Sequence, residues 1–476
     1  MNAAAIERAV APNIFDALAD PDLIFVLILA NLMSDRLWTL AERLDATDPE
    51  TPPVSDVRAI QAMIDRHFEH ITPARVAENV GVLDLEDEAR RLGAEHIAYA
   101  RERIVATMEH RVARGTLQAD DLALDLIRQG GFPAYVYASI DEAWANRRLL
   151  GKRKRKPMGV TCCVDEVALF AALLLTRPGR AIEDVAVLGS PAHYTVLLHD
   201  AAEGPWWFYG KRDLFCPADW AQGIAMYYEG DSQTAFDDRQ PNLDRFVTAS
   251  GRWTATHADD SMDPAEIATL VARCDAFFGT RLRQIDPTLA HSKAAHAEHD
   301  CRALFAALAD ARDGAEVRAR IRSAAVDGDD RFAQRALYAH RALDVPDPGI
   351  YLRVACRSPH LREQAASLTT LDATLAVVAA LPGTESIFLD RERIAMPEET
   401  LRFAMGTDRD RALLLHALLQ HAPALPEAER QELVTLFTTA GSYVTGPGFC
   451  IDGATMARVN APGGEVTHRL ADGRVH

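Results

Sequence analysis

Apolar residues follow one another without interruption in one segment of the chain, residues 167–175. A helix that is apolar on every side is buried, so this segment predicts a core helix. Three shorter segments come after it: residues 185–188 are apolar, residues 193–199 alternate between two faces, and residues 206–209 are aromatic. Such segments are typical of strands. We therefore expect a buried helix packed on a small antiparallel sheet.

Helical periodicity dominates the rest of the chain, so the expected fold class is α+β. Helices are predicted at residues 1–45, 56–70, 72–79, 85–115, 119–131, 263–280, 316–340 and 358–381. A chain of 476 residues is too long for one small core. We divide it into a helical N-terminal region (1–130), the core with the sheet (131–230), a second helical region (231–385) and a C-terminal region (386–476).

Two adjacent cysteines, Cys162 and Cys163, precede the buried helix. A thiol at a helix N-terminus meets unpaired backbone N–H groups and the positive end of the helix dipole, which both favour the thiolate. His193 on a neighbouring strand could accept the thiol proton and return it to a leaving group. The alternative is structural: free cysteines are commonly small buried residues, and a strand histidine can simply be satisfied by a hydrogen bond.

A cysteine at the start of a helix, a histidine on a strand and an aromatic next strand resemble the transglutaminase-like branch of the papain-like cysteine enzymes, over residues 159–213. The matching positions are Cys163, Asp165, Leu169, Gly179, Gly189, His193, Trp206 and Trp207. The resemblance implies a cysteine nucleophile, a histidine that exchanges the proton, and an acidic or amide residue that orients the imidazole. It also implies an acyl-enzyme thioester that passes to an amine or to water.

The family pattern also implies which cysteine reacts. An acidic residue at +2 and apolar residues at +4 and +6 fit a count from Cys163 better than a count from Cys162. The residue that orients the imidazole is matched less well. The family carries Asp or Asn about four residues after the tryptophan that corresponds to Trp206, and this chain has Gly210 there. Asp213 is the nearest carboxylate beyond it and is our candidate. Its alternative is a solvated turn residue.

A second stretch, residues 400–460, resembles a degenerate copy of the same core. It aligns at an offset of 245 residues (408 − 163). The aligned pairs are Asp408 with Cys163, Asp410 with Asp165, and Leu414 with Leu169. Ser442 then lies near the place of the histidine, and residues 449–452 are a candidate third strand. Such a copy cannot run thiol chemistry and would serve packing, dimerisation or substrate positioning. The alternative is a chance match of two leucine-rich helices.

Charge narrows the set of partners. The formal net charge of −18 argues against nucleic acid or an anionic membrane as the partner of the whole surface. In contrast to this negative net charge, the chain contains a run of five consecutive cations, Lys152, Arg153, Lys154, Arg155 and Lys156. We interpret this run as a binding site for an anionic group, such as a phosphate, a phosphopantetheine arm or an acidic carrier protein. The alternative is a solvated loop.

The seven cysteines are scattered without disulfide-framework spacing, which favours a reducing compartment. No signal peptide is recognised, and the apolar run 23–33 is too short to span a bilayer, so we expect a cytoplasmic protein, with an Ala/Arg-rich composition that suggests a GC-rich bacterial source. His296 and His299 share a helical face but have no second ligand cluster, so a metalloprotein is the weaker alternative. No metal or other cofactor is expected.

The expected function is cysteine-dependent acyl transfer, either amide formation or amide hydrolysis, from a donor that a carrier protein could hold. The alternative from another class is a scaffold that keeps the fold and has lost the catalytic residues. Gly210 at the family's acidic position and the degenerate second stretch support that alternative.

Overall fold

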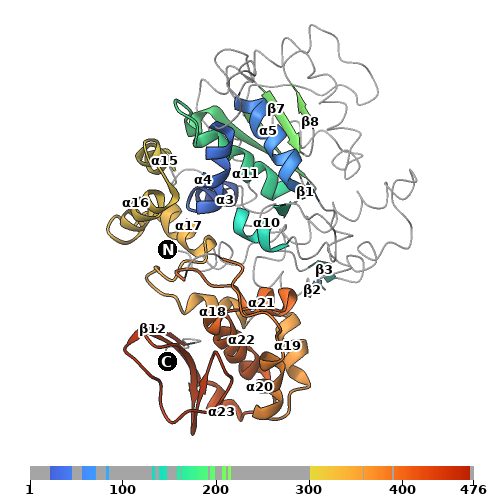
Figure 1. Ribbon diagram of the computed structural model, residues 1–476, viewed down its shortest axis with the longest axis vertical. Coiled ribbons are helices and arrows are strands. Elements are labelled where there is room, and N and C mark those ends of the chain that lie inside the picture. Colours follow the sequence, from blue (N-terminus) through green and yellow to red (C-terminus); the bar gives the residue numbers. More distant parts are fainter. Residues whose placement is uncertain are drawn as a thin grey trace, which may run out of the picture.

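A computed structural model describes residues 22–45, 56–70, 82–84, 131–133, 139–146, 158–161, 163–190, 193–198, 206–210, 213–215, 301–356, 359–388 and 391–471. Within them the chain combines helices with small, mainly antiparallel sheets, so the α+β class is confirmed (Figure 1). The helices expected at 72–79, 85–115 and 263–280, and all of 119–131 except residue 131, lie outside these ranges. Residue 131 begins β3 (Gly131–Pro133), which pairs with β2 (Val82–Asp84).

The first unit consists of helix α11 and a four-stranded antiparallel sheet. Helix α11 (Cys163–Leu175) is followed by strands β5 (Val185–Ser190), β6 (His193–Leu198), β7 (Trp206–Gly210) and β8 (Asp213–Phe215), hydrogen-bonded in that order. The helix packs on β6 and β7, where the rings of Phe170 and Phe208 lie 4.2 Å apart. The buried helix and the three strands predicted from the hydrophobic pattern are confirmed.

Helices from the start of the described chain cover the other side of α11. Helix α3 (Asp22–Leu32) and helix α5 (Asp56–His67) pack against it, and α4 (Asp35–Asp45) packs more lightly (Figure 1). Every residue of α3 from Ile24 on is buried, as its uniformly apolar sequence predicts. Among the described helices none can by itself span a bilayer in length and apolarity; Ile24–Leu32 and Asp35–Leu44 meet the criterion only as a pair, with a 77° bend.

Helix α5 ends three residues earlier than its pattern predicts. Phe68–His70 form strand β1, which pairs in parallel with β4 (Gly159–Thr161) just before α11. A Cβ atom at Gly159 would lie 2.6 Å from the Phe68 ring, so this close pairing requires glycine. The prediction of helix up to residue 70 is therefore wrong at its end, because pairing with a distant strand outweighs local propensity.

The helices of the second half of the chain are shorter than their periodicity predicts. They are α15 (Arg302–Leu308), α16 (Gly314–Val326), α17 (Arg331–Ala339), α18 (Ile350–Ala355), α19 (Pro359–Ala366), α20 (Leu371–Ala379) and α21 (Pro397–Phe403). The helices expected at 316–340 and 358–381 are each broken in two. Asp330 and Thr370 explain the breaks, because each has an extended backbone and caps the next helix by accepting a backbone N–H bond.

The second unit repeats the plan of a helix packed on an antiparallel sheet. Helix α22 (Asp408–His421) precedes the short helix α23 (Glu427–Arg430) and strands β9 (Val434–Thr438), β10 (Ser442–Gly446), β11 (Phe449–Asp452) and β12 (Val466–Ala471). The strand order is β11-β10-β9-β12, and α22 packs on β10 and β9. The strand expected at 449–452 is confirmed. One apolar core extends from Tyr338 to Leu470 and joins this unit to α18, α19 and α20 (Figure 1).

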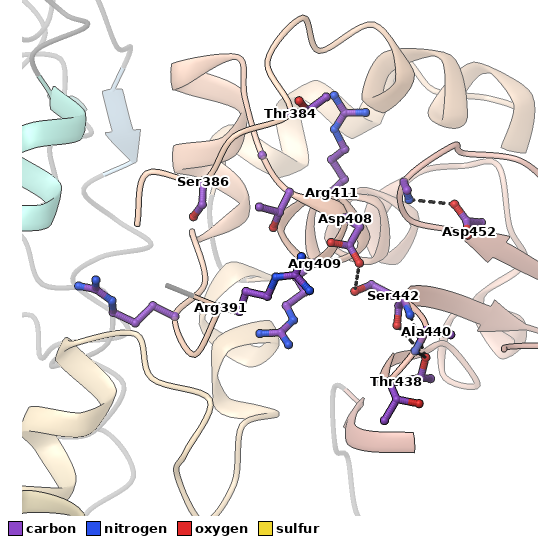
Figure 2. Close-up of a pocket in the computed structure, with 16 residues that line it drawn as sticks. Thr384, Ser386, Arg391, Asp408, Arg409, Arg411, Thr438, Ala440, Ser442 and Asp452 are labelled. Atoms are coloured by element: carbon purple, nitrogen blue, oxygen red, sulfur yellow. Dashed lines mark hydrogen bonds between the residues drawn. The ribbon is translucent and has the colours of Figure 1, made fainter. Parts of the chain in front are cut away.

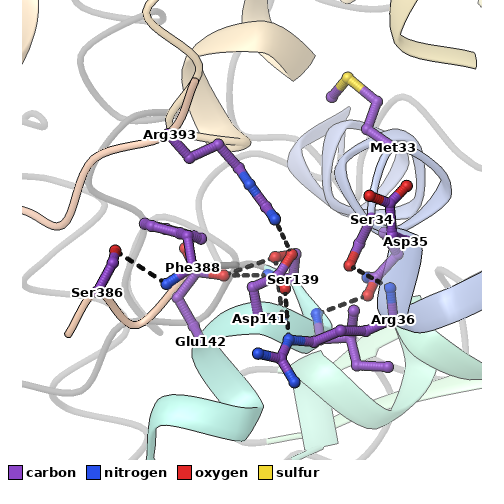
Figure 3. Close-up of polar contacts among 12 residues, drawn as sticks. Met33, Ser34, Asp35, Arg36, Ser139, Asp141, Glu142, Ser386, Phe388 and Arg393 are labelled. Carbon is purple, nitrogen blue, oxygen red and sulfur yellow. Dashed lines mark hydrogen bonds and ion pairs between the residues drawn. The ribbon is translucent and has the colours of Figure 1, made fainter. Parts of the chain in front are cut away.

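Buried ion pairs connect the N-terminal helices to the chain before α21. Asp141, in helix α10 (Ile140–Asn146), is fully buried and accepts bonds from Arg36 of α4, at 3.0 Å, and from Arg393. Figure 3 shows both guanidinium groups converging on this carboxylate. Since removing one member of a buried ion pair leaves an uncompensated charge, loss of any of these three side chains would destabilise the contact of α4 and α10 with the chain before α21.

Candidate functional site

The first unit places the two main candidate residues at the starts of neighbouring elements. Cys163 is the first residue of α11, and His193 is the first residue of β6, the strand on which α11 packs. The structure describes only the backbone of Cys163 and His193; Cys162 and the run Lys152–Lys156 lie outside the described residues. The distance between the thiol and the imidazole stays a prediction.

Asp213 has a strand environment. It begins β8, where its backbone pairs with Gly210 at the end of β7. The side chain of Asp213 lies outside the described ones, so its role as the orienting carboxylate and its alternative as a solvated turn residue both stay predictions. The strand pairing puts Asp213 directly opposite the position where the transglutaminase-like pattern has its acidic residue.

The first turn of α11 carries two buried carboxylates. Asp165 and Glu166 are 4% and 2% exposed. Thr161, at the end of β4, donates from Oγ1 to Glu166 Oε1 at 3.0 Å. Acidic residues in the first turn stabilise a helix through its dipole. This bond ties the strand before the helix to the helix start, and so positions the backbone of Cys163.

In the second unit, a hydrogen bond links the equivalent starting residues. Ser442 begins β10 and donates from Oγ to Oδ2 of Asp408, the first residue of α22, at 2.8 Å (Figure 2). Ser442 is 2% exposed. Sequence alignment puts Ser442 only near the place of the histidine. The structure brings Asp408 and Ser442 into direct contact.

Local sequence explains how the start of α22 is held. Thr407 caps the helix, and Asp410 returns the bond by accepting from the Thr407 backbone N–H at 2.9 Å. Asp410 also accepts from the Ala395 N–H at 2.8 Å, and burial raises the pKa of its carboxyl to about 6. A Cβ atom at Gly453 would lie 2.5 Å from the Asp408 carbonyl oxygen. Glycine there lets the chain after β11 touch the helix start.

A pocket of about 500 Å³ opens at this helix start. Its polar lining includes four arginines, Arg391, Arg393, Arg409 and Arg411 (Figure 2). Sequence reasoning does not single out these arginines. Their signal is present as the segments RER at 391–393 and RDR at 409–411, but only the fold brings the two segments to one cavity. Among the described residues, no group of three or more His, Cys, Asp or Glu side chains could hold a metal ion. His296 and His299 lie outside the described ranges.

Comparisons with known proteins return no relative: no family model, no curated protein and no solved structure matches this chain.

Proposed function

We propose that the protein is a cysteine-dependent acyl transferase or amide hydrolase whose nucleophile is Cys163. The observation that carries the proposal comes from comparing the two units. Each has a helix packed on a strand, and in the second unit the first residues of helix and strand, Asp408 and Ser442, are in hydrogen-bond contact. Cys163 and His193 occupy the same two starting positions in the first unit.

The proposed chemistry follows from these positions. Free N–H groups and the dipole at the start of the 13-residue helix α11 favour a thiolate at position 163. The Cys163 sulfur attacks an amide or thioester carbonyl, while its backbone N–H helps to hold the oxyanion. A carbon–sulfur bond forms, the bond to the leaving group breaks, and His193 gives the leaving group the proton that it took from the thiol. An amine or water then attacks the thioester, and Asp213 orients the imidazole.

The expected partners follow from charge and chemistry. The acyl donor is an amide or a thioester, which a phosphopantetheine-linked carrier protein could present to the cations Lys152–Lys156. The acceptor is an amine or water. A cytoplasmic, reducing location would keep Cys163 as a free thiol. Neither nucleic acid nor a membrane surface is proposed as a partner, because the chain carries a net charge of −18.

Thiol labelling tests the proposal. An ordinary free thiol has a pKa of about 8.5 and reacts slowly with iodoacetamide at pH 6 to 7. We expect wild-type protein to gain one adduct rapidly in this range, Cys162→Ala to keep it, and Cys163→Ala to lose it, as measured by intact mass. Incubation with amide and thioester donors should then give an acyl adduct with the same dependence on Cys163. An adduct that persists in Cys163→Ala would refute the mechanism.

Two neighbouring variants test the role of the histidine. Val196 and Leu198 of β6 are fully buried, and their strand partners Phe208 and Trp206 lie on the same face, toward α11. Alternation would also give this face to residue 194, so pairing of Cys163 with His193 requires the alternation to change at the start of β6. His193→Gln should slow the labelling of Cys163, whereas Tyr194→Phe should not. The reverse result would remove His193 from the mechanism.

A catalytically inactive interaction protein is the second candidate. Gly210 ends β7 where the transglutaminase-like pattern has an acidic or amide residue. In the second unit, the helix begins with Asp408, which has no thiol. The labelling experiment separates the two candidates: a Cys163 that reacts no faster than the partly buried Cys301 and Cys356 favours the scaffold.

A further inference from the structure

The pocket at the start of α22 has a mainly polar lining. Hydroxyl side chains from four separate segments contribute to it: Thr384 and Ser386, Thr407, Thr438 and Thr439, and Ser442. Glycine, alanine, two aspartates and four arginines complete the lining. A volume of about 500 Å³ is within the range of small-molecule sites, which is roughly 300 to 1,000 Å³. Because most of the lining is polar, the pocket suits a small polar ligand.

Positive charge in the pocket exceeds negative charge. Arg393 pairs with Asp141, a carboxylate outside the lining that it shares with Arg36. Within the described part of the chain, none of Arg391, Arg409 and Arg411 forms an ion pair with a carboxylate. Arg391, Arg409 and Arg411 therefore bring three positive charges to a lining with two carboxylates, and the 14-residue helix α22 adds the positive end of its dipole. This balance favours an anionic ligand.

Two of these arginines also have buried donors without acceptors. Arg411 is only 7% exposed; its Nη2 donates to the carbonyl groups of Leu381 and Gly383, at 2.9 and 3.1 Å, whereas its Nε has no partner. Arg409 has a buried Nη1 without a partner, and its guanidinium lies over the Phe437 ring, 5.5 Å from the ring centre. Both guanidinium groups are thus held in place at the pocket, Arg411 by two backbone carbonyls and Arg409 by the Phe437 ring, and neither uses all its donors within the protein.

We infer that this pocket binds a phosphate-bearing ligand through Arg391, Arg409 and Arg411. Guanidinium groups match phosphate oxygens with paired N–H donors, and phosphate offers enough acceptors for several arginines at once. Figure 2 shows the Asp408–Ser442 pair beside Thr438 and Asp452, with Ser386 and Arg391 toward the other side. Asp408 and Asp452 already accept hydrogen bonds from Ser442 and from the chain after β11, so these carboxylates are partly satisfied within the protein.

This inference does not depend on thiol chemistry. The residues named for phosphate belong to α22 and to the chain before α21, and none of them belongs to the first unit. It gives the second unit a role of its own: with Asp408 and Ser442 at the positions of nucleophile and base, the cleft of a helix packed on a sheet serves recognition instead of bond making.

Calorimetric titration of full-length Cys163→Ala protein with inorganic phosphate at low ionic strength tests the inference, because this background removes the proposed chemistry. We expect saturable binding that weakens with added salt. Arg409→Met and Arg391→Met should each weaken it at least about tenfold, which corresponds to about 1.4 kcal/mol. The matched control is Arg458→Met, since Arg458 is an exposed arginine outside the pocket that pairs with Asp372.

Arg391 is exposed, so its replacement is not expected to disturb folding, and circular dichroism checks this for each variant. Titration with pantetheine 4′-phosphate and with pantetheine identifies the source of the phosphate: tighter binding of the phosphorylated arm than of inorganic phosphate indicates a carrier arm, and equal binding indicates a small phosphorylated metabolite. No saturable binding of phosphate to the Cys163→Ala protein, or equal binding by Arg409→Met and Arg391→Met, would overturn the inference.

Discussion

The two units use one plan with different residues at its centre. Their helices begin 245 residues apart (408 − 163), and their second strands begin 249 residues apart (442 − 193). The first unit has Cys163 and His193 at these starts, and the second has a hydrogen-bonded Asp408 and Ser442. The fourth strands differ as well, because β8 extends the first sheet beyond β7 whereas β12 extends the second beyond β9. The two units therefore carry different residues at the starts of the helix and of the second strand.

A second difference concerns which strand positions face the helix. In the second unit, Thr435 of β9 bonds to His416 of α22 at 3.0 Å, and its strand partner Val444 shares that face with Ser442. In the first unit, Val196 and Leu198 face the helix. With the starts of the two strands aligned, the faces are out of phase by one residue. The Asp408–Ser442 contact of the second unit therefore predicts a Cys163–His193 contact only if the alternation of β6 changes at its start. The variants His193→Gln and Tyr194→Phe test this.

The largest expected effect tests whether the two helices are equivalent core elements. Leu169 of α11 and Leu414 of α22 occupy aligned positions and are 1% and 0% exposed. Replacing either leucine with alanine should lower the free energy of unfolding by about 3 kcal/mol, through lost apolar burial and the cavity left behind. Urea denaturation measures it. Val326→Ala, at a half-exposed position, should change the stability by under about 0.5 kcal/mol. Unequal losses for the two leucines would break the equivalence.

The buried carboxyl group of Glu142, in helix α10, should give the free energy of unfolding an unusual pH dependence. Burial raises the pKa of Glu142 to about 7, against the opposing field of Arg341. An unfolded glutamate has a pKa of about 4.3, so between these values the folded state holds a proton that the unfolded state has released. Stability therefore falls as pH rises through this window. Glu142→Gln should remove roughly 2 to 3 kcal/mol of that fall.

Comparison of wild type with Glu142→Gln isolates this effect from two other buried groups. The raised pKa of Asp410, about 6, contributes a fall in the same direction, whereas the pKa of His416, lowered to about 3, contributes a rise in stability from about pH 3 to 6.5. Both remain in the variant. Glu427→Gln, in the exposed helix α23, is the control and should leave the profile unchanged. Parallel profiles for wild type and Glu142→Gln would contradict the prediction.

Gly453 tests how closely the second sheet approaches its helix. An alanine Cβ there would meet the Asp408 carbonyl oxygen at 2.5 Å and the Ser442 carbonyl oxygen at 2.9 Å. Both are backbone atoms, so the structure must shift, and Gly453→Ala should cost about 2 kcal/mol of unfolding free energy. At Gly441 the nearest atom would be 3.5 Å away, so Gly441→Ala is the matched control. If thermal melts show the two variants to be equally stable, the close approach is not needed.

Sequence reasoning reaches the elements of both units because their signals are local. The uniformly apolar run before Leu175 and the alternation after His193 predict α11 and β6, and the aligned leucines predict α22. Contacts between distant segments are not encoded in this way. The pairing of Phe68 with Gly159 and the ion pairs of Asp141 join residues far apart in the chain, and no local pattern predicts them.

The candidate sites also differ in whether a local sequence signal predicts them. Cys163 follows from its place before the predicted buried helix. The start of α22 follows from the alignment with that helix, and Ser442 follows approximately from the same alignment, which ignores a four-residue difference between helix and strand offsets. The arginine pocket does not follow, because Arg391 and Arg409 look like ordinary solvated charges until the fold places them in one cavity.

The smallest expected effect concerns the Asp408–Ser442 contact itself. Ser442→Ala removes the 2.8 Å hydrogen bond to a carboxylate that remains partly open to water, so water replaces much of the lost bond. The variant should lose about 1 kcal/mol of unfolding free energy. Ser323→Ala is the matched control, since Ser323 bonds to Asp327 at 2.9 Å on an exposed helix end, where the loss should be close to zero. Because Ser442 and Cys163 belong to different units, Ser442→Ala should leave the iodoacetamide labelling rate of Cys163 unchanged. A slower rate would mean that the two units communicate, and the comparison between them would then no longer be one between independent sites.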